Sequence, residues 1–227
     1  MPRPEPTRWS LVQGAADGDT EQRERFARRY APILRSYFSA KWRTSPDHDD
    51  VLDATQDVFV QLFKDKGALE AVDAGRPGGF RAYLYGVAGN VARMRERQFA
   101  RRHRVEKGES VVRFEALERH DATLSRVFDQ AWARMVAREA RRRLAELAAS
   151  DERQALRFRC LELRYSLGLE PRQIAERLEM PVTDVYERLR EARKAYHSAL
   201  LDVLAEQSPA ATRAELERTC RELVAAL

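Results

Sequence analysis

The chain has 227 residues, of which 34% are charged and 8% aromatic, so little apolar mass is available for one broad core. Lys and Arg (41) exceed Asp and Glu (36) by five, a modest charge whose distribution matters more than its size. No run of eighteen apolar residues predicts a membrane span, and the first residues lack the apolar core of a signal peptide. Cys160 and Cys220 lack metal-type spacing, so we expect two reduced, partly buried thiols in a cytoplasmic protein.

The apolar periodicity is helical nearly throughout and almost no strand signal is present, so we expect an all-α protein. In the first half, the pattern predicts a short helix around Val12, helices over 21–42 and 49–64, a glycine-rich loop over 67–79, and a helix over 80–103. In the second half, helices are expected over 124–147 and 151–166, then a helix-turn-helix, then a last amphipathic helix.

The predicted organisation is two small helical domains joined by a linker. The first covers 1–104, the linker 105–125 and the second 126–205, and a C-terminal helical extension covers 206–227. Ser208-Pro209 has the composition of a helix start, which predicts that the last helix begins there. Its expected apolar face comprises Leu216, Cys220, Leu223, Val224 and Leu227.

The helix expected over 49–64 separates acidic from apolar residues at 100° per residue. One face carries Asp50, Asp53, Asp57, Gln61 and Lys64, and the other carries Val51, Val58, Phe59, Leu62 and Phe63. Asp is a poor helix former in mid-helix, so the acidic face is either ordinarily solvated or a docking surface for a basic partner. Catalysis by these carboxylates is not expected, because no nucleophile, phosphate loop or metal cluster accompanies them.

The next helix combines an apolar face with a basic stripe. Its expected core residues are Phe80, Leu84, Val87, Val91 and Met94, and its stripe consists of Tyr83, Asn90, Arg93, Arg97 and Arg101. Asn can read a base edge, Arg can bind phosphate or guanine, and Tyr can stack on an unpaired base. The stripe therefore suits DNA, including separated strands; the alternative is a solvated basic helix face.

Residues 171–194 read as a helix-turn-helix. Its expected core is Ile174, Ala175, Leu178, Val185 and Leu189. The second helix is expected to present Thr183, Glu187, Arg190, Glu191 and Lys194, with Arg188 and Arg193 flanking that face. Arg and Lys suit phosphates and Glu can accept from cytosine, which favours major-groove entry. The turn lacks the usual glycine and the two glutamates repel phosphate, so a helical hairpin without DNA contacts stays open as an alternative.

These segments, in this order, resemble a sigma-70-type RNA polymerase sigma factor of the compact extracytoplasmic-function class. Asp50-x-x-Asp53-x-x-Gln56-Asp57-x-Phe59 is similar to the motif that docks on the clamp helices of the polymerase beta-prime subunit. Residues 80–90 are similar to the region that opens and reads the −10 promoter element, and residues 171–194 to the helix-turn-helix that reads the −35 element. The resemblance covers about residues 20–104 and 126–204.

The resemblance implies specific site residues. Polymerase binding would involve Asp50, Asp53, Gln56 and Asp57; −10 binding would involve Tyr83, Asn90, Arg93, Arg97 and Arg101; and −35 binding would involve Thr183, Glu187, Arg188, Arg190 and Lys194. Two departures stand out: Leu52 replaces an acidic residue, and Tyr186 replaces a common lysine.

The opening Thr7-Arg-Trp-Ser-Leu-Val12 and the Thr55-Gln56-Asp57 sequence resemble a subgroup associated with Ser/Thr protein kinases rather than with membrane anti-sigma factors. Thr55 nevertheless falls in the apolar arc of its helix, between Val51 and Val58, so a phosphate there would be buried at high cost. Any phosphorylation control is therefore expected at another site.

The expected function is that of a cytoplasmic, non-enzymatic bacterial transcription initiation factor that needs no cofactor. Its partners would be core RNA polymerase (the beta-prime clamp helices and the beta flap), promoter DNA, and a Ser/Thr kinase or anti-sigma regulator. The alternative is a stand-alone helix-turn-helix repressor whose first domain mediates dimerisation. The C-terminal extension is read either as a regulatory helix, which we favour, or as a cap on the second domain.

Overall fold

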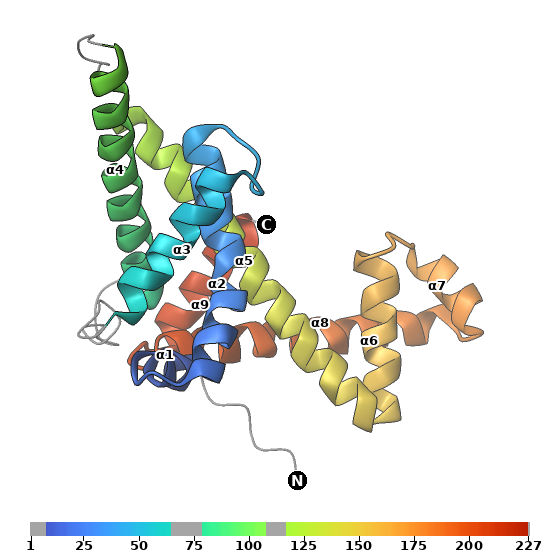
Figure 1. The fold of residues 1–227 in the computed structure, drawn as a ribbon. Coiled ribbons are helices and arrows are strands. Elements are labelled where there is room, and N and C mark those ends of the chain that lie inside the picture. The colour runs from blue at the N-terminus through green and yellow to red at the C-terminus, as the bar shows by residue number, and fades with distance from the viewer. Residues whose placement is uncertain (1–7, 65–78, 108–116, 227) are drawn as a thin grey trace. The chain divides into compact units, whose positions relative to one another are not determined.

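The computed structural model describes residues 8–64, 79–107 and 117–226, and they are helical apart from short turns and caps (Figure 1). No strand occurs within these ranges, so the all-α prediction is confirmed. None of the described helices is both long and apolar enough to cross a membrane. The elements are α1 (Arg8–Ala16), α2 (Thr20–Trp42), α3 (Asp49–Phe63), α4 (Gly79–Lys107), α5 (Leu117–Ser150), α6 (Glu152–Tyr165), α7 (Pro171–Leu178), α8 (Val182–Gln207) and α9 (Arg213–Ala226).

Contacts divide the chain into two units whose boundaries differ from the predicted domains. Unit 2 is Val136–Ala205, and unit 1 combines the residues up to Met135 with those from Glu206 onward. The chain therefore leaves unit 1 within α5 and returns to it within α8. The expected linker is helical at both of its described ends, because α4 runs to Lys107 and α5 begins at Leu117; residues 108–116 lie outside the described part.

Aromatic packing forms the centre of unit 1. Tyr30 of α2 lies 5.1 Å from Phe80 of α4 and 5.7 Å from Trp132 of α5, measured between ring centroids. Phe26 lies one turn before Tyr30, at a centroid distance of 4.6 Å. Such ring pairs each contribute about 0.5–1.5 kcal/mol beyond the area they bury. The rings thus join the first part of α5 to α2 and to α4, the helix that carries the basic stripe.

Polar contacts also tie α5 and the C-terminal segment into unit 1. Arg81 of α4 donates from Nε to Asp129 Oδ1 over 2.9 Å. Trp132 Nε1 donates to Gln207 Oε1 over 3.2 Å, and Gln207 is only 7% exposed. This bond to the buried Gln207 oxygen joins the last residue of α8 to α5 within unit 1. The C-terminal segment therefore belongs to unit 1.

The last helix starts later than predicted. Its first turn is closed by Thr212 and Glu215: the Thr212 backbone N–H donates to Glu215 Oε2 over 2.7 Å, and the Glu215 N–H donates to Thr212 Oγ1 over 3.4 Å. This reciprocal capping satisfies backbone donors at the start of α9. The helix therefore begins directly after Thr212 and not at Ser208-Pro209. On its apolar face Leu216, Cys220 and Leu223 are buried, whereas Val224 is 54% exposed and Leu227 lies outside the described residues.

Unit 2 contains the expected helix-turn-helix. Its core combines Cys160 and Leu163 of α6, Ile174 and Ala175 of α7, and Val185 and Leu189 of α8, with Leu178 partly buried against it. Pro171 occupies the first turn of α7, and the Glu170 backbone N–H donates to Gln173 Oε1 over 2.8 Å. Glu179 ends α7 in the left-handed conformation, with φ +51°, where glycine is the usual residue.

Both cysteines are free and buried. Burial raises the pKa of the Cys160 thiol and that of the Cys220 thiol, so both stay protonated at neutral pH. Cys160 belongs to unit 2 and Cys220 to unit 1. The rate at which each thiol reacts with an alkylating reagent therefore reports the opening of its own unit.

Candidate partner and nucleic-acid interfaces

The α3 helix presents the expected acidic face. His48 caps the helix, since its Nδ1 accepts from the Asp50 backbone N–H over 3.2 Å. Asp50 and Gln56 are exposed, the Asp53 side chain is 59% exposed, and that of Asp57 is 32% exposed. The opposite face buries Val51, Ala54, Thr55, Val58 and Leu62. The helical phase inferred from the sequence is confirmed.

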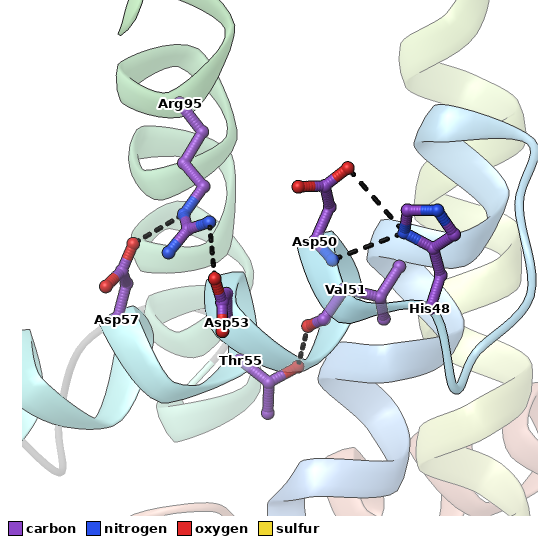
Figure 2. Close-up of polar contacts among 7 residues, drawn as sticks. All are labelled: His48, Asp50, Val51, Asp53, Thr55, Asp57 and Arg95. Carbon is purple, nitrogen blue, oxygen red and sulfur yellow. Dashed lines mark hydrogen bonds and ion pairs between the residues drawn. The ribbon is translucent and has the colours of Figure 1, made fainter. Parts of the chain in front are cut away.

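Arg95 of α4 reaches across to this acidic face, as Figure 2 shows. Its Nε donates to Asp57 Oδ2 over 2.6 Å, and its Nη1 lies 3.5 Å from Asp53 Oδ2. Partial burial lowers the pKa of Arg95, but the hydrogen bonds and charges of Asp57 and Asp53 outweigh it, and the net pKa is raised. Two of the four predicted docking residues are thus already held by a cation of the same unit.

Sequence reasoning missed Arg95 because the stripe predicted for this helix, from Tyr83 to Arg101, does not include it. The available signal was phase: Arg95 follows Val91 by four residues, so it lies on the core-facing side of α4 and not on the Asn90 stripe. An arginine on a core-facing side requires a carboxylate partner. The carboxylates of the neighbouring α3 supply it.

Thr55 lies inside the helix packing. Its side chain is 4% exposed, and its Oγ1 donates to the Val51 carbonyl over 2.7 Å (Figure 2). The hydroxyl is therefore satisfied within α3 and closed to solvent. This confirms the expectation that Thr55 belongs to the apolar arc.

The α4 stripe is exposed for most of its length. Asn90, Arg93, Arg97 and Arg101 all lie on the surface, while Phe80, Leu84, Val87 and Val91 are buried beneath and Met94 is half-buried. Arg93 Nη2 donates to Asn90 Oδ1 over 2.5 Å, which orders both side chains. Tyr83 is half-buried, and its ring centroid lies 6.2 Å from that of Phe80. Its side chain is therefore less exposed than those of the other four residues of the stripe.

The outer face of α8 carries four of the five predicted −35 residues. Thr183, Glu187, Arg190 and Lys194 are exposed. Arg188 is half-buried and lies 3.6 Å from Glu191, and it lines a hollow of about 450 Å³ with residues of α6. The structure therefore places Arg188 on the α6 side of the helix, apart from the other four.

Glu191 is withdrawn from the outer face. Arg157 Nε donates to Glu191 Oε2 over 2.6 Å, and this hydrogen bond is the main cause of the lowered pKa of Glu191. One of the two glutamates thought to repel phosphate is thus neutralised within unit 2. The outer face of α8 is more favourable for a polyanion than its sequence suggests.

Among the described residues, no three His, Cys, Asp or Glu side chains are grouped to hold a metal ion. No protein-family model matches the chain, and no curated protein is significantly similar to it. The arrangement of charged faces on two helical units is therefore the basis for assigning a function.

Proposed function

We propose that this chain is a transcription initiation factor that binds core RNA polymerase and contacts promoter DNA at two separate elements. The observation that carries the proposal is the pairing of two exposed basic surfaces in two different units. One is the Asn90–Arg101 stripe of α4 in unit 1, and the other is the outer face of α8 in unit 2. A protein with two such surfaces can grip DNA at two places along the duplex.

The two surfaces suit different parts of a promoter. The helix-turn-helix of unit 2 has the buried core and the exposed second helix that major-groove entry requires. In unit 1, the Arg93–Asn90 bond orders the side chains that would contact the −10 element. Arg97 and Arg101 continue that stripe by two turns and supply phosphate contacts.

The exposed part of the acidic face supports polymerase docking. Asp50 and Gln56 point to solvent, and Asp53 keeps more than half of its side chain exposed. A basic partner surface such as the beta-prime clamp helices would complement these residues, and unit 2 would contact the beta flap. The protein would act in the cytoplasm, where polymerase and DNA are found, under control of a Ser/Thr kinase or anti-sigma regulator.

A run-off transcription assay with purified core polymerase tests the proposal. A genomic fragment library serves as the template pool, and the transcripts are sequenced to find the selected start sites. We expect start-site-specific transcripts with the wild-type chain and fewer with Asp50→Arg at the same protein concentration, whereas Arg213→Gln on α9 should behave as wild type. Tight binding to duplex DNA by the chain alone, without any transcript, would identify a stand-alone repressor instead.

A further inference from the structure

Arg193 of α8 is held by a neutral partner. Its Nε donates to Tyr165 Oη over 2.8 Å, and its guanidinium carbon lies 6.0 Å from the Tyr165 ring centroid. Tyr165, at the end of α6, is 60% exposed, and Arg193 is exposed as well. Among the residues the structure describes, no carboxylate forms an ion pair with Arg193.

This arrangement contrasts with that of other arginines of unit 2. Arg141 and Arg164 bind Glu162 and Glu170, so their charges are compensated within the protein. Arg193 keeps its full charge although its position is fixed. Because Tyr165 occupies only Nε, the two terminal nitrogens remain as a fork that fits two oxygens of one phosphate. Ordering the side chain in advance also lowers the entropy lost on binding.

The position of Arg193 along α8 selects phosphate over bases. Arg193 follows Thr183 by ten residues, which is about 15 Å along a helix. The major groove is about 12 Å wide. When the first turns of a helix enter the groove, a residue about 15 Å further along the helix no longer reaches the base edges. Arg190, three residues earlier, lies on the adjoining surface. Arg193 therefore meets the backbone at the rim of the groove.

We propose that Arg193, positioned by Tyr165, is a phosphate clamp of the helix-turn-helix, and that Tyr165 acts through it as a positioning residue. The proposal rests on the DNA-binding function proposed above and adds to it a contact outside the recognition surface that the sequence indicated. It makes the end of α6 part of the nucleic-acid interface.

The test is the salt dependence of DNA binding by the full-length chain. Arg93→Gln, Arg97→Gln and Arg101→Gln are combined first, so that binding through α4 is suppressed. Anisotropy of a fluorescein-labelled, mixed-sequence duplex is then measured over a series of KCl concentrations. Each lost phosphate contact lowers the slope of log affinity against log salt by about 0.9.

In this background we expect Arg193→Gln to lower the slope by about 0.9. Arg193→Lys should keep the slope but bind more weakly. Tyr165→Phe, which removes the acceptor and keeps the ring, should weaken binding about five-fold without changing the slope, because one hydrogen bond is worth roughly 1 kcal/mol. The matched control is Arg153→Gln, which removes the same charge at the opposite end of α6 and should leave the slope unchanged.

The outcomes separate this proposal from the function on which it rests. An unchanged slope in Arg193→Gln, with a lowered slope in Arg190→Gln, would overturn the clamp and leave DNA binding intact. An equal change of slope in Arg153→Gln and Arg193→Gln would show that only the net charge of unit 2 matters, and it would overturn the clamp. Absence of salt-dependent binding in this background would overturn the clamp together with the role of unit 2 in DNA binding.

Discussion

Arg95 Nε donates to Asp57 Oδ2 over 2.6 Å, and this bond joins α4 to the acidic face of α3 (Figure 2). Arg95 is 23% exposed and Asp57 32%, so water screens the pair only in part. The helix that carries the proposed −10 surface is thereby linked to the helix that carries the proposed polymerase surface. A basic partner that reaches Asp57 must compete with a cation already in place.

Arg95→Gln should therefore lower the stability of unit 1 and raise its affinity for core polymerase. We expect a loss of about 1–2 kcal/mol in the free energy of unfolding, because a charge-assisted hydrogen bond is removed. We expect affinity for core polymerase at low salt to rise, because two carboxylates are released. Urea unfolding followed by tryptophan fluorescence reports unit 1, since Trp9, Trp42 and Trp132 all belong to it. Arg93→Gln on the same helix is the matched control, and an equal stability loss there would contradict the bridge.

Core polymerase binding is best tested at Asp50 and Gln56. Reversing Asp57 would place two arginines against each other, so a loss of binding could reflect misfolding. Asp50 has a 70% exposed side chain, and exposed substitutions usually change stability by about 0.5 kcal/mol or less. Asp50→Arg with Gln56→Arg should weaken binding to core polymerase by about ten-fold or more, because like charges would meet. Wild-type affinity in a titration of labelled core polymerase would remove α3 from the interface.

Thr55→Glu should destabilise unit 1. The side chain is 4% exposed and surrounded by the packing of α3, so the new carboxylate would be buried without a partner. A buried charge that has no partner typically lowers the free energy of unfolding by about 3–5 kcal/mol. Thr55→Val keeps the shape, loses only the bond to the Val51 carbonyl, and should cost about 1 kcal/mol. A Thr55→Glu chain as stable as wild type and more active in transcription would show that phosphorylation at this position is a usable switch.

Periodicity was sufficient where a helix has one buried face. The buried positions of α3 and α4, such as Val58 and Leu84, follow from spacing alone, and so does the small core around Ile174. Contacts between helices were not predictable in this way. The contact of Arg95 with Asp57 could be predicted only with the position of α3 known, and the burial of Arg188 only with the position of α6 known. The return of the C-terminal segment to unit 1 depends on Trp132 and Gln207, which are 75 residues apart.

Glu179→Gly should stabilise unit 2. The left-handed conformation costs a residue with a Cβ about 1–2 kcal/mol, and the added flexibility of glycine offsets about 0.5–1 kcal/mol of that gain. The rate of alkylation of buried Cys160, measured in a Cys220→Ala background, reports opening of unit 2 and should fall up to about ten-fold, since 1.4 kcal/mol corresponds to ten-fold. Glu176→Gly, inside α7, should raise the rate instead. A faster reaction in Glu179→Gly would show that Glu179 is not strained.

Removing residues 208–227 should destabilise unit 1 and leave unit 2 unchanged. The deletion uncovers the surface that buries Leu216, Cys220 and Leu223, and each buried leucine contributes about 1.5–3 kcal/mol. Gln207 stays in place, so its bond to Trp132 is retained. Tryptophan fluorescence should show a lower urea midpoint, while Cys160 should remain as slow to alkylate as in the full chain. A point variant, Leu216→Asp, should reproduce the fluorescence shift, whereas Val224→Asp, at an exposed position of the same helix, should not. If deletion made Cys160 reactive and left the fluorescence midpoint unchanged, the segment would cover unit 2 and the assignment to unit 1 would fail.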